Sequence, residues 1–188
     1  MSKLKIETGS SPAEARFSIT VTEKGPFLVY GRPPLAEQFI MPNERNESWY
    51  FQEGRHYSTE AEPTALCRCG ASKRKPYCDG THETAAWNPE LTAPDESLLD
   101  AAETIEGGAL TMTDNPKYCV FARFCHPQGD AWTLTEQSED PEARQLAIRE
   151  ASMCPSGRLM AWNRETMQPY EFRFKPSLGL IEDVTIGS

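Results

Sequence analysis

A group of three cysteines and one histidine constrains this 188-residue chain more than any other feature of its sequence. Residues 67–82 read CRCGASKRKPYCDGTH, with the spacing C-x-C-x8-C-x3-H. Cys67 and Cys69 are two residues apart, so on an extended strand both thiolates would point to one side and reach the same metal. Cys78 and His82 have the spacing of one helical turn, so we expect a short helix to present both to a second metal. The stretch therefore predicts a compact site with four ligands.

This stretch resembles the motif of the CDGSH, or NEET, iron-sulfur family, which reads C-x-C-x2-Ser/Thr-x3-Pro-x-C-D-G-Ser/Ala/Thr-H. Every specified position is filled, and the positions besides the four ligands hold Ser72, Pro76, Asp79, Gly80 and Thr81. The β-rich run that begins at about Phe17 is also similar to the small β-structure that precedes the cluster loop in this family. The resemblance covers roughly the first 85 residues.

The resemblance implies a 2Fe-2S cluster with Cys67 and Cys69 on the inner iron and with Cys78 and His82 on the outer, solvent-near iron. Three thiolates and a neutral imidazole carry one negative charge less than four thiolates, so reduction should be easier than in a four-cysteine cluster. We expect a reduction potential between about −400 mV, typical of plant-type ferredoxins, and the range of two-histidine Rieske sites, roughly −150 to +300 mV.

The histidine ligand also predicts sensitivity to acid. Its unperturbed pKa is about 6.5, and a protonated imidazole cannot bind iron. We therefore expect reduction to be coupled to a proton and the cluster to be lost in mild acid.

Two alternatives accompany this interpretation. The same four residues could hold a structural zinc ion, because three cysteines and one histidine are also a zinc ligand set; the complete motif favours iron and sulfide. A basic island surrounds the site in an otherwise acidic chain, and it could either dock an acidic redox partner or merely offset the anionic cluster. The island consists of Arg68, Lys73, Arg74 and Lys75.

A second set of three cysteines lies in the other half of the chain. Cys119 and Cys125 have the spacing C-x5-C, and Cys154-Pro155 follows after 28 further residues. A cysteine followed by proline is a recurring end of ferredoxin cluster motifs. This half resembles the divergent single-cluster ferredoxin-like modules that accompany CDGSH domains, although the usual four-cysteine run is absent.

The fourth ligand of this second set is open. We favour His126, which would complete a 2Fe-2S site, while three cysteines alone could hold a 3Fe-4S cluster. A third alternative is that the three thiols are buried and bind no metal, since cysteine is often a small core residue.

The hydrophobic pattern of the first half predicts small β-structure. Residues 17–31 alternate apolar and polar positions around Lys24-Gly25, which is typical of a hairpin. Further extended segments are predicted at 38–41 and 48–52, between prolines and glycines that act as turn residues. The loop composition of residues 87–95 indicates the end of this domain.

The second half predicts two helices and two strands. A short helix is expected at 96–105, and a clearer one at 141–152, where Asp140 suits the N-terminal cap. Strands are expected at 158–162 and 170–174. The pattern therefore predicts an α+β fold.

Two domains are expected in this fold. Residues 1–90 would form a small, β-rich CDGSH-type 2Fe-2S domain, and residues 91–188 would form a small α+β iron-sulfur module.

Composition limits the partners and the compartment. The 19 basic and 28 acidic residues give a formal charge of −9, which disfavours nucleic acid and anionic membrane surfaces. No segment approaches the roughly 18 to 20 apolar residues that span a bilayer, and the N-terminal residues lack the apolar core of a secretory signal. We expect a cytoplasmic protein whose six cysteines bind metal rather than form disulfides.

The function expected from these features is electron transfer or the storage and transfer of iron-sulfur clusters, with a redox or cluster-acceptor protein as partner. The sequence contains no Gly-rich phosphate loop and no Ser-His-Asp arrangement, so we do not expect an enzyme. The alternatives are a redox enzyme or enzyme subunit that uses the clusters as an electron relay, and an interaction domain that the metals only stabilise. CDGSH domains commonly pair as homodimers, and both a monomer and a homodimer are open.

Overall fold

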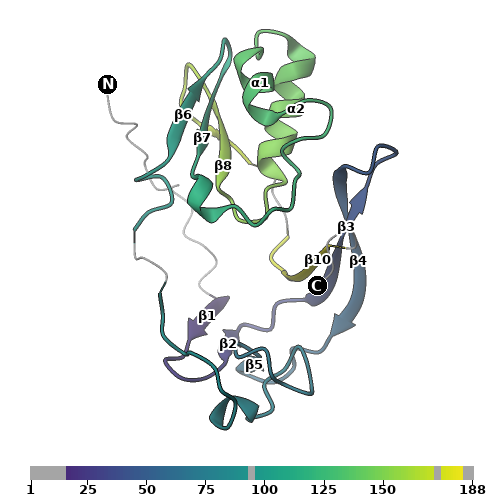
Figure 1. Cartoon of the computed structure of the whole chain (residues 1–188), viewed down its shortest axis with the longest axis vertical. Coiled ribbons are helices and arrows are strands. Elements are labelled where there is room, and N and C mark those ends of the chain that lie inside the picture. The colour runs from purple at the N-terminus through teal and green to yellow at the C-terminus, as the bar shows by residue number, and fades with distance from the viewer. Residues whose placement is uncertain (1–15, 93–95, 172–174, 184–188) are drawn as a thin grey trace. The chain divides into compact units, whose positions relative to one another are not determined.

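The computed structural model confirms an α+β fold with more strand than helix (Figure 1). It describes residues 16–92, 96–171 and 175–183. In the described part of the chain, no helix has the length and apolarity that a membrane crossing needs.

The chain folds into two compact units. The first contains the described parts of residues 1–35 and 57–93, and the second contains those of 36–56 and 94–188. The hairpin formed by residues 36–56 therefore belongs to the second unit, although it lies within the predicted N-terminal domain. The predicted boundary near residue 90 stays a prediction.

The first unit is built on a three-stranded antiparallel sheet with the order β1-β2-β5. Strands β1 (Ser18–Val21) and β2 (Phe27–Tyr30) form the predicted hairpin, in which Val21 pairs with Phe27. Strand β5 (Thr64–Leu66) pairs with β2 and ends one residue before the first cysteine. The sheet therefore delivers the chain directly into the cysteine-rich loop.

The second unit contains a four-stranded antiparallel sheet with the order β6-β7-β8-β9. Its strands are β6 (Glu103–Glu106), β7 (Leu110–Asp114), β8 (Leu159–Asn163) and β9 (Pro169–Tyr170). Helices α1 (Ala131–Glu136) and α2 (Pro141–Ser152) cover one face of it (Figure 1). Fully buried side chains of both helices and of the two central strands fill the space between them, among them Leu110, Met112, Ala131, Ala147 and Ala161.

A separate sheet of the second unit has the order β10-β3-β4. It consists of β3 (Leu35–Pro42), β4 (Ser48–Tyr57) and β10 (Leu178–Asp183). The predicted extended segments at 38–41 and 48–52 are confirmed as parts of β3 and β4. The Phe51 ring of β4 packs on Phe124, with 4.7 Å between the ring centroids.

The predicted helix at 96–105 is wrong. The chain forms a turn at 98–101 and then enters β6, where Thr104 pairs with Thr113 of β7. A short isolated helix is marginal in water, whereas the β-branched pair Thr104-Ile105 suits a strand for which β7 offers a partner. Pairing within the sheet therefore overrides the helical spacing of the apolar residues.

The structure confirms the second predicted helix of the C-terminal half and one of its two predicted strands. Helix α2 is confirmed, and the Asp140 carboxylate accepts hydrogen bonds from the N–H groups of Glu142 (3.3 Å) and Ala143 (3.4 Å). The predicted strand at 158–162 is confirmed as β8, whereas 172–174 lie outside the described residues. Helix α1 was not predicted because it is only six residues long, although its Asp130 cap accepts from Thr133 N at 2.8 Å.

Candidate metal centres

Cys67 and Cys69 form the first ligand pair. The strand β5 ends at Leu66, so the two cysteines lie in a bend rather than on the predicted extended strand. Their Sγ atoms are nevertheless 3.9 Å apart. A tetrahedral metal with metal–sulfur bonds of roughly 2.3 Å separates two of its thiolates by about 3.8 Å. The pair therefore fits two positions on a single metal ion.

Cys78 and His82 form the second pair, with 3.3 Å between Cys78 Sγ and His82 Nδ1. The same tetrahedral geometry places a sulfur and a nitrogen ligand about 3.5 Å apart. The prediction that one helical turn presents both residues is wrong, because the 3₁₀ helix η1 (Thr81–Glu83) begins only after Cys78. Gly80 instead turns the chain at φ 85°, in the left-handed region that favours glycine.

Main-chain hydrogen bonds bring the two pairs onto neighbouring segments. The Cys67 N–H donates to the Pro76 carbonyl at 2.7 Å, and the Cys78 N–H donates to the Ala65 carbonyl at 2.9 Å. Leu66 and Tyr77 form an antiparallel bridge between these two bonds. The segment that carries Cys67 and Cys69 therefore lies beside the segment that leads to Cys78 and His82.

Two polar side chains hold the loop between the pairs. The buried Ser72 hydroxyl donates to the Tyr77 carbonyl at 2.7 Å and accepts from the Arg74 N–H at 3.0 Å. The Asp79 carboxylate accepts from the N–H groups of Lys73 (2.9 Å) and Thr81 (3.0 Å). Hydrogen bonds from the Thr81 side chain and from these two N–H groups hold the pKa of Asp79 well below its usual range. The side chains of Ser72 and Asp79 therefore hold the main chain of the loop in place through hydrogen bonds.

The environment of Cys67 favours the thiolate. Burial raises the pKa of this thiol, but the N–H groups of Ser72 and Gly70, the Cys69 side chain and the charge of Lys75 together lower it below its ordinary value. Iron binds the thiolate form of cysteine. This part of the site is therefore disposed to bind metal.

Arg68 of the basic island has a structural role in the first unit. Its guanidinium donates to the carbonyls of Gly25 (2.9 Å), Glu23 (3.1 Å) and Pro89 (3.0 Å). It also lies over the Trp87 ring, 4.7 Å from the centroid. The three other basic residues of the island, at positions 73 to 75, are exposed.

The His82 side chain is half-buried beside the β1–β2 turn. A Cβ atom added to Gly25 would lie 3.7 Å from His82 Nε2 and only 2.8 Å from Thr22 Oγ1, so the turn approaches the ring where glycine leaves room. Trp87 Nε1 donates to the His82 carbonyl at 3.0 Å. These contacts leave Nδ1 as the nitrogen that faces Cys78.

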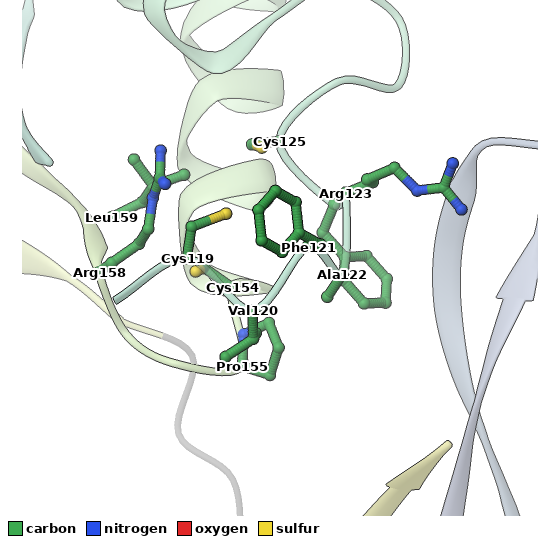
Figure 2. A pocket seen from close by; sticks show the side chains of 11 residues that line it. Cys119, Val120, Phe121, Ala122, Arg123, Cys125, Cys154, Pro155, Arg158 and Leu159 are labelled. Atoms are coloured by element: carbon green, nitrogen blue, oxygen red, sulfur yellow. The ribbon is translucent and has the colours of Figure 1, made fainter. Parts of the chain in front are cut away.

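Cys119, Cys125 and Cys154 line a single cavity in the second unit (Figure 2). The cavity holds about 280 Å³ of space, part of it open to solvent, and its remaining lining includes the buried side chains of Phe124 and Leu159. Within the described residues, no three Cys, His, Asp or Glu side chains are close enough together to hold one metal ion. The three thiols therefore surround a cavity and are too far apart to bind one metal ion together.

The loop between Cys119 and Cys125 has an unusual backbone. Phe121 (φ 57°) and Arg123 (φ 60°) both lie in the left-handed region, which non-glycine residues rarely adopt. Such conformations persist where the surrounding structure imposes them, and they cluster at functional sites. Alternating turn conformations of this kind also form the main-chain concavities that bind anions and iron-sulfur clusters.

The ionisation of Cys125 is influenced by the groups that surround it in the cavity. Burial raises the pKa of the Cys125 thiol to about 11, the Arg158 charge opposes this rise, and the nearby Cys154 and Cys119 groups add to it. Thiols that disfavour one another's ionisation need a compensating cation, which metal binding would supply.

His126 has other neighbours. Its side chain is exposed and is not among those that line the cavity. Its ring lies beside that of Trp132, with 5.7 Å between the centroids, and its charge helps to lower the pKa of Asp130 after the larger contribution of the Thr133 N–H. The structure thus brings together the three cysteines, and His126 as fourth ligand stays a prediction.

Comparison with protein families gives two matches. Residues 24–83 match the model described as "Iron-binding zinc finger CDGSH type", and residues 105–164 match "Divergent 4Fe-4S mono-cluster". The chain is an iron-sulfur protein. The two resemblances predicted from the cysteine patterns are confirmed, and each matched segment contains one of the two sites. No curated protein and no solved structure matched the chain.

Proposed function

We propose that this iron-sulfur protein carries two clusters and acts in electron transfer or in the storage and transfer of clusters. The first would be a 2Fe-2S cluster held by Cys67 and Cys69 on one iron and by Cys78 and His82 on the other. The observation that supports this arrangement is the pairing of the ligands, at 3.9 Å and 3.3 Å, each a separation suited to one tetrahedral iron. A single structural zinc would need all four ligand atoms around one point.

A bound cluster would supply one-electron redox chemistry, and the residues of the chain would control access to it. The three thiolates would bind iron, and His82 Nδ1, which faces Cys78 Sγ, would be the fourth ligand atom. Ser72 and Asp79 hold the loop that carries these ligands. The exposed basic residues at 73 to 75 suit an acidic partner protein, which we propose as the redox or cluster-acceptor partner.

For the second site we propose a cluster held by Cys119, Cys125 and Cys154. The family description names a 4Fe-4S cluster, while the sequence pattern also allows a 2Fe-2S cluster with His126 or a 3Fe-4S cluster with the three cysteines alone. Substitution of His126 by alanine separates these possibilities. Loss of the second cluster would assign His126 as a ligand, and its retention would leave the three cysteines to hold it.

The remaining proposals concern the context in which the protein works. All six cysteines are free thiols, which suits a reducing cytoplasm. We propose that the chain passes electrons or clusters to its partner and is not itself an enzyme. Turnover of a substrate by the isolated protein, or tight binding of a flavin or nicotinamide, would favour the redox enzyme instead.

The test is to purify the protein without oxygen, count iron and sulfide per chain, and record ultraviolet-visible and electron paramagnetic resonance spectra. The proposal expects acid-labile sulfide and two cluster signals after reduction. One signal would remove the second cluster from the proposal. Zinc without sulfide would refute it for both sites.

A further inference from the structure

A buried ion pair lies at the second site. Arg158 Nη2 donates a hydrogen bond to Asp114 Oδ2 at 2.9 Å, and Arg158 Nε lies 2.9 Å from Asp114 Oδ1 as an ion-pair contact whose geometry is not that of a hydrogen bond. The side chains are 10% and 5% exposed, respectively. A hydrogen bond between two charged groups is stronger than one between neutral groups.

Trp132 fixes the pair further. Its Nε1 donates to Asp114 Oδ2 at 2.9 Å, and its ring lies beside the guanidinium, 5.7 Å from ring centroid to Arg158 Cζ. The main chain contributes as well, because Asp114 pairs with Leu159 across strands β7 and β8. The positive charge of Arg158 is therefore held in one place by a sheet, a carboxylate and an aromatic ring.

This fixed charge faces the cysteine cavity. Arg158 is one of the residues that line it, together with Cys119, Cys125 and Cys154. Arg123, the other cationic residue of the lining, is exposed and lies on the opposite side of the cavity (Figure 2). A buried charge is screened far less by water and salt than an exposed one.

We propose that Arg158 is a positioning residue whose fixed positive charge raises the reduction potential of the cluster held by Cys119, Cys125 and Cys154. Asp114 limits how much of that charge reaches the cluster. Reduction transfers one electron from an external one-electron donor to a ferric ion, with no bond formed or broken, so the site gains one negative charge. A nearby cation stabilises that added charge. This inference rests on the proposed second cluster.

The test is a dye-mediated redox titration of the iron-loaded protein, in which electron paramagnetic resonance follows each cluster. Asp114→Asn leaves the Arg158 charge unbalanced and should raise the potential of the second cluster. Arg158→Met leaves the Asp114 charge unbalanced and should lower it. We expect each change to alter the equilibrium constant for one-electron reduction about tenfold or more, equivalent to about 59 mV.

Two further variants separate charge from folding. Asp114→Asn/Arg158→Met removes both charges and should return the potential towards that of the wild type, and it remains informative if Arg158→Met alone does not fold. Arg164→Met removes one positive charge, as Arg158→Met does, but at an exposed residue outside the cavity. It should leave the potential of the second cluster unchanged.

The outcomes are distinct. Shifts of opposite sign in the two single variants support the inference, because a merely structural role gives no reason for Asp114→Asn to raise the potential. A second cluster whose potential does not move, or moves in the same direction in both, overturns the inference and leaves the proposed cluster intact. A wild-type protein with no second cluster overturns both.

Discussion

Among single side chains, His82 differs from the three cysteines of its site because it offers an uncharged imidazole nitrogen, which cannot bind a metal once it is protonated. With Nδ1 facing Cys78 Sγ, the neutral ring would share an iron with that thiolate, whereas the protonated ring could not. We expect His82→Cys to remove the steep loss of the first cluster in mild acid. The decay of visible absorbance after a pH jump measures this.

The matched control for this change is His56→Gln. His56 is exposed and pairs with Glu53 at 2.9 Å, away from the four ligands in sequence. It should leave the acid sensitivity of the wild type in place. Equal acid sensitivity in His82→Cys and wild type would show that another group governs cluster loss.

A second residue with unusual surroundings is Glu150 of helix α2. It is fully buried, and neither carboxylate oxygen has a hydrogen-bond partner among the described residues. Burial raises its pKa to about 8 from an ordinary 4.5; Arg149 opposes the shift, while Asp130 and Glu47 add to it. The folded protein therefore keeps a proton that the unfolded chain releases above pH 4.5.

This difference predicts how stability varies with pH. Between pH 4.5 and about 8 the folded state binds more protons, so the contribution of Glu150 to stability is full at the acidic end and declines as pH rises. Glu150→Gln removes the titration, and its melting temperature should exceed that of the wild type by a margin that grows from pH 6.5 to pH 8. Thermal unfolding at several pH values measures that margin.

Glu142→Gln is the control for this prediction, since Glu142 is an exposed carboxylate on the same helix. Its melting temperature should follow that of the wild type at each pH. A margin for Glu150→Gln that stays constant with pH would contradict the assigned titration.

At the scale of elements, the cysteine-rich loop depends on Ser72 as much as on its ligands. Ser72→Ala would leave the Tyr77 carbonyl and the Arg74 N–H without their partner, and a buried polar group left unpaired costs about 1–3 kcal/mol. We expect the first cluster to be lost several-fold faster on incubation with an iron chelator. Ser72→Thr keeps the hydroxyl and should lose its cluster at nearly the wild-type rate; equal rates in all three proteins would refute this role.

At the scale of the whole molecule, each set of cysteines belongs to one of the two compact units. We therefore expect the two clusters to load independently. Cys78→Ser should abolish only the first cluster signal, and Cys125→Ser only the second, with the iron content falling accordingly. Loss of both signals in either variant would mean that one site needs the other in order to form.

The sequence by itself determined the features that depend on neighbours along the chain. The ligands of the first site, the β1–β2 hairpin and the Asp140 cap of α2 are all set by spacings of a few residues, so a local pattern is enough to predict them. Even there, the tertiary structure decided that the ligand pairs meet through bends instead of a strand and a helix.

Only the tertiary structure decided the surroundings of the second site. Asp114 and Arg158 are 44 residues apart in the chain, and Phe51 meets Phe124 from a hairpin within the predicted N-terminal domain. The competition between a helix and strand β6 at 103–106 was likewise settled by pairing with β7. Contacts between distant segments leave no periodic signal in a single sequence, because they depend on how completed elements pack.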